Sequence, residues 1–259
     1  MTKFTHLLCC FSLLLVVACG KSEKEKESNR DKENKVERTV SSSERYLKSV
    51  ENVHKKEDFL KEDLVSFKFD VKLSEKELQG KVVARTNMAE FSVELSDGSV
   101  WYYNSLNDLF SAEVNDKEIE QLLSFVVGGY FTFYSISGEN YTYTDKEKKE
   151  FLEREFSKVS LNNSASKRFF PQEFTVFVED RTSMLKGTSR NHPLKKRQPI
   201  FLQYDKFITV NRIPVSLSWQ FFESTKDNLM SKNIGEAKIT AISYPKDDGK
   251  QINSAELLN

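Results

Sequence analysis

The sequence predicts a β-rich α+β fold, made of antiparallel sheets or small barrels with an N-terminal helix and a linking helix. Segments in which apolar and polar residues alternate recur from residue 65 onward, and a period of two is typical of half-buried strands. Asp97 and Gly98 lie between two such segments and form a hairpin turn signal. With 259 residues, 30% of them charged, and a mean hydropathy of -0.54, the chain has room for one large or two small domains with polar surfaces.

The first half of the chain is predicted to begin with a helix and to continue mainly as strands. Three serines at 41–43 offer an N-cap, and the residues after them place a set of apolar side chains on one helical face. This set is Tyr46, Leu47, Val50 and Val53. Strands are expected at 65–71, 79–85, 90–95, 99–104, 130–137 and 141–144, with a helix at 116–125. This order of elements resembles the small five-stranded OB barrel. We therefore expect residues 43–163 to form an α+β domain that resembles this barrel.

The second half is predicted to be β-rich after one linking helix. Residues 146–159 predict this helix, with Phe151, Leu152 and Phe156 on its inward side. A polar break at 162–166 marks the domain boundary, if the chain has two domains. Residues 164–259 are then a β-rich domain or the second half of the same domain. Further strands are expected at 173–178, 199–204, 206–210, 215–222 and 237–244.

The N-terminal stretch predicts where the protein acts. Lys3 precedes an apolar run of 12 residues from Leu7 to Ala18. This length suits the core of a secretory signal and is shorter than the roughly 20 residues that a membrane-spanning helix needs. We therefore expect an export signal.

The end of this run, Val16-Val17-Ala18-Cys19, resembles the lipobox of bacterial lipoproteins. The resemblance covers this segment alone. It implies that residues 1–18 are a signal peptide, that cleavage separates Ala18 from Cys19, and that the Cys19 thiol carries a diacylglyceryl anchor with fatty-acyl chains such as palmitate. Gly20 stands where an Asp commonly retains such proteins at the inner membrane, so the outer membrane is allowed if the cell has two membranes. The alternatives are an ordinary secreted protein with a cysteine near its start, and a short anchor helix that is not cleaved.

Residues 19–42 are expected to be a disordered tether between anchor and domain. The stretch has alternating charges and almost no apolar residue, so it cannot bury enough surface to offset its chain entropy. A single charged helix is the alternative. Cys9 and Cys10 leave with the signal and Cys19 is acylated, so no disulfide and no thiolate metal site is expected. With only His54 and His192 remaining, far apart in the chain, we expect neither a metal nor another cofactor.

The charge is unevenly distributed along a chain whose net charge is zero. Residues 42–163 hold 16 basic and 23 acidic residues, whereas residues 164–232 hold 12 basic and 6 acidic residues. Such asymmetry steers anionic partners to the second half or lets the halves attract one another. The stretch 186–197 is read as a basic loop for an anionic partner, such as phosphorylated envelope polymer or an acidic protein, or as a solvated loop. Its cations are Lys186, Arg190, Lys195, Lys196 and Arg197.

Aromatic residues are concentrated in the middle of the chain. On exposed strands they would stack on sugars or on a partner's apolar patch, but the pattern favours core packing for most of them. They are Trp101, Tyr102, Tyr103, Tyr130, Phe131, Phe133, Tyr134, Tyr141 and Tyr143. The sequence has no serine-hydrolase elbow, phosphate loop or zinc-protease motif, and no residue is assigned a catalytic role.

These observations favour a lipid-anchored protein of the bacterial cell envelope that acts as a non-catalytic binding module. The partner is a protein or an envelope polymer, and the membrane is contacted through Cys19. Nucleic acid is not expected as a partner, because aromatics are not interleaved with the basic residues. Two alternatives are an inhibitor or immunity protein against an envelope-acting enzyme or toxin, and an envelope hydrolase without a familiar motif.

Overall fold

The computed structural model describes residues 39–106, 109–112, 116–151, 154–165, 171–195, 197–224, 230–249 and 252. The expectations for the signal peptide, for Ala18 and Cys19, and for the tether up to residue 38 lie outside these residues. Residues 39–259 belong to one compact unit. Within the described ranges, no helix combines the length and the apolar character needed to cross a membrane.

Three α-helices and one 3-10 turn are present in the described residues. They are α1 (Ser42–Val53), α2 (Lys56–Lys61), α3 (Lys117–Phe131) and η1 (Thr132–Tyr134). The predicted N-terminal helix is confirmed, and Ser41 caps it by accepting a hydrogen bond from the Glu44 amide at 3.1 Å. Asp116 caps α3 in the same way, accepting hydrogen bonds from the amides of Glu118 and Ile119.

The strands form a single antiparallel sheet. In spatial order along it the strands are β5 (Leu109–Ala112), β4 (Val100–Asn104), β3 (Glu90–Leu95), β2 (Lys76–Arg85), β1 (Leu64–Leu73), β13 (Met230–Ser243), β12 (Ile213–Ser224), β11 (Pro199–Val210), β10 (Met184–Asn191), β9 (Glu173–Glu179), β8 (Arg154–Asn163) and β6 (Tyr141–Tyr143), with β7 (Glu147–Phe151) also paired to β8. The prediction of a β-rich antiparallel fold is confirmed. Because β1 pairs with β13, the first and last strands of the chain lie at the middle of the sheet.

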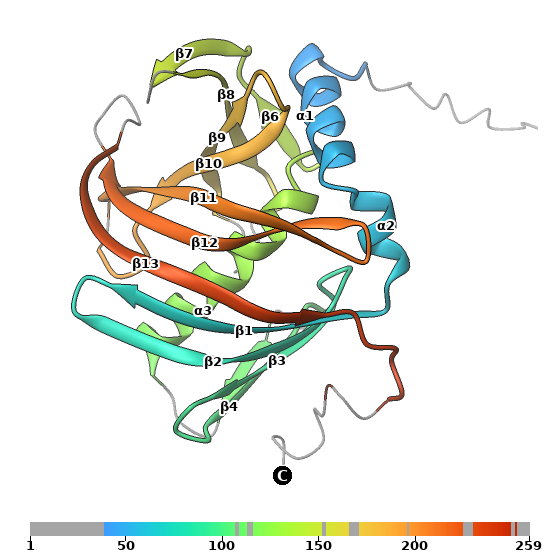
Figure 1. Cartoon of the computed structure of the whole chain (residues 1–259), viewed down its shortest axis with the longest axis vertical. Coiled ribbons are helices and arrows are strands. Elements are labelled where there is room, and N and C mark those ends of the chain that lie inside the picture. Colours follow the sequence, from blue (N-terminus) through green and yellow to red (C-terminus); the bar gives the residue numbers. More distant parts are fainter. Residues whose placement is uncertain are drawn as a thin grey trace, which may run out of the picture. The chain divides into compact units, whose positions relative to one another are not determined.

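Helix α3 covers one face of the sheet, called the inner face below, and the opposite face is called the outer face (Figure 1). The Tyr130 ring stacks on Phe67 of β1 at 4.3 Å, and Phe125 meets Phe221 of β12 at 5.4 Å. A Cβ on Gly129 would lie 3.0 Å from Cζ3 of Trp219, so this glycine lets the helix approach β12 closely. The main core therefore lies between α3 and the inner face.

Two sequence predictions in the middle of the chain are wrong. Residues 130–137 were expected to be a strand after two glycines, but α3 continues through both glycines to Phe131 and ends in η1. Residues 146–159 were expected to be the linking helix, but they form β7 and the first part of β8. In β8 the buried Val159 and Leu161 alternate with more exposed residues, and this pattern, with the pairing to β9, prevails over the helix propensity of the Lys and Glu residues.

The OB-like barrel is not confirmed. The strands of the first half continue into the larger sheet, and among the described residues the edge strands β5 and β6 do not pair with each other. The two strands expected at 199–204 and 206–210 are one strand, β11. The predicted break at 162–166 begins within β8, which includes Asn162 and Asn163, and β8 and β9 are hydrogen-bonded neighbours.

Two buried ionisable side chains attach α1 to the rest of the fold. Glu51 accepts hydrogen bonds from the backbone amides of Ile136 and Ser137 at 2.8 and 3.0 Å. His54, at the C-cap of α1, accepts a hydrogen bond through Nε2 from the Leu185 amide at 3.0 Å. The pairing of β10 with β9 shifts register just after Leu185. The imidazole therefore accepts a hydrogen bond from an amide at an irregular point of the ladder. Both side chains therefore have structural roles.

Candidate functional site

A pocket of about 450 Å³ lies where β6, β8, β9, β10 and the start of β11 meet. Successive side chains of a strand point to opposite faces of a sheet. Leu161 and Phe174 belong to the main core, so the residues that alternate with them point to the outer face. The pocket is therefore a hollow of the outer face, and we call it the outer-face pocket.

Polar side chains on three neighbouring strands form two rows in this pocket. Ser160 of β8 lies opposite Thr175 of β9, which lies opposite Ser189 of β10, so the first row consists of hydroxyl groups. Asn162 of β8 lies opposite Glu173 of β9 in the second row, and Asn191 of β10 follows Ser189 by two residues. All these residues line the pocket.

One hydrogen bond joins two neighbours in each row, and the hydroxyl oxygen of Ser189 lies 3.4 Å from that of Ser224. The Ser160 and Thr175 hydroxyl oxygens are 2.8 Å apart, and Asn162 Nδ2 donates to Glu173 Oε1 at 3.3 Å. Thr175 and Ser189 are buried, whereas Asn162, Glu173 and Asn191 are exposed. Hydroxyl groups thus form the floor of the pocket, and amide and carboxylate groups form part of its rim.

The predicted basic loop is not a single loop. Lys186 and Arg190 lie in β10, which the sequence analysis did not anticipate and which pairs with both β9 and β11. Lys195 and Arg197 lie between β10 and β11, and Lys196 lies outside the described residues. The Lys186 Nζ atom lies 4.5 Å from the centre of the Phe207 ring. The described cations are therefore divided between a strand and the segment after it.

Arg190 faces the core and not a partner. Arg190 is 7% exposed, and its Nη2 donates a hydrogen bond to the Phe125 carbonyl oxygen of α3 at 2.6 Å. The guanidinium carbon also lies 4.1 Å from the centre of the Phe125 ring. Burial lowers the pKa of Arg190 to about 10, which leaves the group charged at neutral pH. Arg190 is thus a core residue that connects β10 to α3.

The prediction that most of the central aromatics pack in the core is confirmed. The buried members are Trp101, Tyr102, Tyr103, Tyr130, Phe131, Phe133 and Tyr134. Tyr141 and Tyr143 are half-buried and pack against the main core. These rings are therefore not an exposed platform on which sugars stack.

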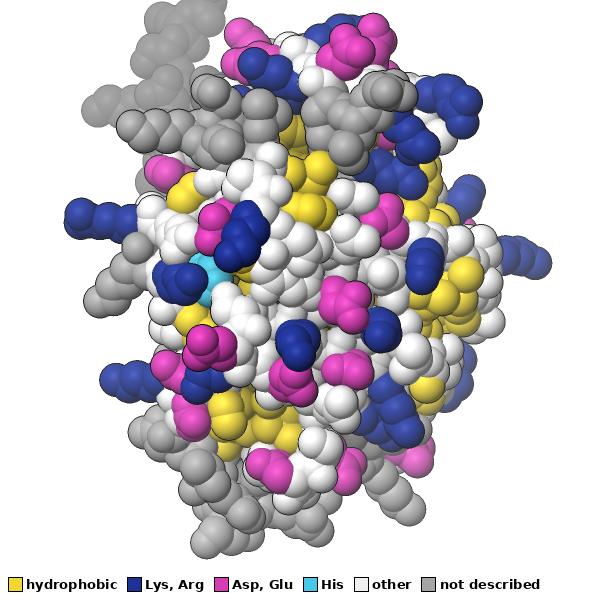
Figure 2. Space-filling view, turned by 60° about the vertical axis from the view of Figure 1, so that its left-hand side comes forward, with side chains coloured by type: hydrophobic (Ala, Val, Ile, Leu, Met, Phe, Trp, Pro, Cys, Tyr) yellow, Lys and Arg dark blue, Asp and Glu magenta, His cyan; other side chains and the backbone are white. Residues whose placement is uncertain are grey.

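Charged side chains of both signs are interspersed on the surface seen in Figure 2. Yellow hydrophobic patches lie between them on this face. Within the described residues, no group of three or more His, Cys, Asp or Glu side chains is placed to hold a metal ion.

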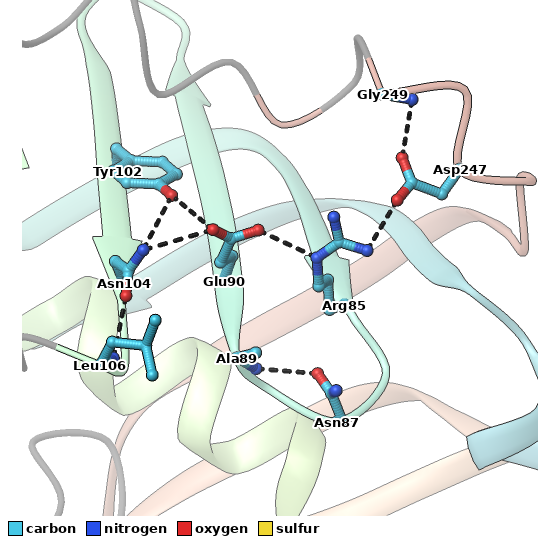
Figure 3. Close-up of polar contacts among 9 residues, drawn as sticks. All are labelled: Arg85, Asn87, Ala89, Glu90, Tyr102, Asn104, Leu106, Asp247 and Gly249. Carbon is cyan, nitrogen blue, oxygen red and sulfur yellow. Dashed lines mark hydrogen bonds and ion pairs between the residues drawn. The ribbon is translucent and has the colours of Figure 1, made fainter.

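A second polar cluster ties the C-terminal segment 244–249 to β2, β3 and β4 (Figure 3). Arg85 Nε donates to Glu90 at 2.9 Å, and Arg85 Nη1 donates to Asp247 at 2.7 Å. Glu90 also accepts hydrogen bonds from Tyr102 Oη at 3.0 Å and from Asn104 Nδ2 at 3.3 Å. Hydrogen bonding from the Gly249 amide, followed by that from Arg85, lowers the pKa of Asp247. This cluster holds a chain segment in place and is structural.

Replacing Arg85 with alanine is expected to release this C-terminal segment. The lost bond to Asp247 joins two charged groups at an exposed site, so local opening becomes easier, and exchange of the amides in 244–249 is expected to accelerate several-fold. Hydrogen exchange measures this. Lys72→Ala removes an exposed ion pair with Glu77 and is the matched control. Equal exchange rates in both variants would show that Arg85 does not hold the segment.

The outer-face pocket was missed by the sequence analysis. The sequence pattern predicts a helix at 146–159 and a boundary at 162–166, so it does not place Ser160 and Asn162 on a strand. The alternation of Ser160, Asn162 and the apolar Leu161 was the available signal.

Comparisons with known proteins show the fold and not a family. No protein-family model matches the sequence, and no curated protein is a detectable relative. The structure resembles a LolA superfamily protein from Nitrosomonas europaea, with a TM-score of 0.55 and 9% identity over 80% of this chain and 99% of that one. A DUF1329 family protein from Desulfovibrio piger matches with a TM-score of 0.48 and 8% identity over 82% of this chain and 98% of that one. The first of these matches shows that the chain has a LolA-like fold.

Proposed function

We propose that this chain is a lipid-anchored, non-catalytic binding module of the bacterial cell envelope, with its ligand site in the outer-face pocket. The observation that carries the proposal is the lining of that pocket, where hydroxyl, amide and carboxylate side chains from adjacent strands converge in one hollow. Ligand sites are concave and orient their ligand with a small number of placed polar groups. Strand residues hold such groups rigidly.

The chemistry of the interior supports binding over catalysis. Glu51, His54 and Arg190 are buried ionisable groups, and each is hydrogen-bonded to backbone atoms of another element. Their positions are explained by the packing of α1, α3 and β10. In the outer-face pocket the amide and carboxylate groups of Asn162, Glu173 and Asn191 are instead exposed at the rim, where a ligand has access to them.

The anchor in this proposal is the acylated Cys19, with the charged segment 19–42 as a tether. Each buried methylene of an acyl chain contributes about 0.8 kcal/mol, so two or more chains hold a polar domain stably at a membrane. Gly20 after the cysteine is compatible with the outer membrane of a cell that has two membranes. Cleavage between Ala18 and Cys19 is part of the same proposal.

Growth with labelled palmitate tests the anchor. The wild-type protein is expected to carry the label and to sediment with membranes, and Cys19→Ala to lose the label and to leave the membrane fraction. Cys9→Ala is the matched control, because Cys9 lies within the proposed signal peptide and its loss leaves the label in place. A wild-type protein that is unlabelled and fractionates away from membranes would refute the anchor.

A further inference from the structure

We propose that the outer-face pocket binds a saccharide without negative charge, through hydrogen bonds from its two polar rows. This inference rests on the proposed binding function and names the ligand class of that site. It rests on three observations, which are the hydroxyl row, the amide and carboxylate row, and the sign of the charge that faces the pocket.

The hydroxyl row matches a ligand that is itself rich in hydroxyl groups. Ser160, Thr175 and Ser189 lie on adjacent strands, whose spacing is about 4.8 Å. A hydroxyl group donates one hydrogen bond and accepts two, so a hydroxyl that already has one partner can still bond to a ligand hydroxyl. Ser160 and Thr175 are already joined at 2.8 Å, and a ligand hydroxyl extends this chain. The buried positions of Thr175 and Ser189 place this row at the floor of the pocket.

The second row adds planar groups that select orientation. The Glu173 carboxylate has about four lone-pair sites, and the Asn162 amide donates to one oxygen at 3.3 Å. A carboxylate and an amide at adjacent positions accept from and donate to neighbouring hydroxyl groups of a sugar ring. Asn191, on the next strand, supplies a further amide at the same rim.

The charge of the lining residues disfavours phosphorylated or carboxylated ligands. Glu173 is the acidic residue of the lining, and it points to the outer face with Thr175 and Ser160. Arg190 is the basic residue of the lining, but its guanidinium is directed to the core, where it binds the Phe125 carbonyl. An anionic ligand would therefore meet a carboxylate with no compensating cation among the described lining residues. A phosphorylated polymer, one of the anionic partners considered for residues 186–197, is therefore disfavoured at this pocket.

Titration of the full lipidated chain in detergent micelles with three tetrasaccharides tests the inference. The probes are cellotetraose and chitotetraose, which are uncharged, and tetragalacturonate, which carries carboxylates. Calorimetry is expected to show binding of an uncharged probe and at least tenfold weaker binding of tetragalacturonate. Asn162→Ala and Glu173→Ala are each expected to weaken binding about 10- to 100-fold. Each substitution removes one side chain that forms a hydrogen bond with a hydroxyl group of the saccharide.

Glu94→Gln is the matched control. Glu94 lies in a separate depression of the outer face, on β3, and its replacement is expected to leave saccharide affinity unchanged. Asn162 and Glu173 are exposed, so their variants are expected to fold, and the unfolding temperature of each verifies this.

Three results would overturn the inference. They are preference for tetragalacturonate, absence of binding to all three probes, and binding that is insensitive to replacement of Asn162 and Glu173. Palmitate labelling detects the anchor independently of saccharide binding. A labelled protein that binds no saccharide therefore refutes the ligand class and does not contradict the proposed anchor.

Discussion

Replacing Glu51 with leucine is expected to lower the free energy of unfolding by about 3 to 5 kcal/mol. The Glu51 residue is 2% exposed, and its Oε1 accepts from the amides of Ile136 and Ser137. Its Oε2 accepts from Lys56 Nζ at 2.8 Å and from the Ser137 hydroxyl. Leucine fills a similar volume but leaves two amides of the segment after η1 without an acceptor and Lys56 without its ion pair. Urea unfolding followed by circular dichroism measures the change.

Two further variants separate the hydrogen bonds of Glu51 from its charge. Glu51→Gln keeps an oxygen that accepts from the Ile136 and Ser137 amides but loses the ion pair, so an intermediate loss of about 1 to 2 kcal/mol is expected. Glu57→Gln changes an exposed carboxylate on α2 and is expected to change stability by less than about 0.5 kcal/mol. If Glu51→Leu is no less stable than Glu57→Gln, the contacts of Glu51 do not stabilise the attachment of α1 to the fold.

Local patterns predicted much of this fold because they report which face of an element is buried. The strands at 65–71 and 90–95 alternate strictly, and the structure contains them as β1 and β3. The pattern fails where local preference and long-range pairing disagree. Residues 146–159 are rich in Lys and Glu, which favour helices, yet their pairing across β7, β8 and β9 makes them strands. The glycines of α3 look like a helix end, but Gly129 is needed for the approach to Trp219.

The outer-face pocket is harder to predict than the strands that form it. Ser160, Thr175 and Ser189 are separated in sequence and become neighbours only through the register of three strands. A one-residue shift of that register would turn the hydroxyl groups to the inner face. The sequence shows the residue types, whereas their convergence depends on the assembled sheet. The anchor prediction is of the opposite kind, because Val16 to Cys19 are contiguous and their meaning does not depend on the fold.

Acidification from about pH 7.5 to about pH 5 is expected to lower the free energy of unfolding by about 2 kcal/mol through His54 alone. Burial, and next the nearby Lys186 charge, lower the pKa of His54 to about 3, whereas an unfolded histidine titrates near 6.5. Below pH 6.5 the unfolded chain therefore binds a proton that the folded chain does not bind. The contribution of His54 to the free energy of unfolding is fully present above pH 6.5 and is lost as the pH falls towards 3. In the fold, neutral Nε2 must accept from the Leu185 amide, so protonation breaks this contact.

Urea unfolding of His54→Gln at several pH values isolates this contribution. The variant no longer titrates at this position, so its loss of stability on acidification is expected to be smaller than that of the wild type by about 2 kcal/mol. His192 adds a second contribution of the same sign, because burial, and then the charge of Lys195, lower its pKa to about 4. Lys186→Gln removes only the second cause of the His54 shift, and burial still holds the folded pKa low, so its acid loss down to about pH 5 is expected to be close to that of the wild type. An acid loss in His54→Gln equal to that of the wild type would show that a protonated imidazole is tolerated beside Leu185.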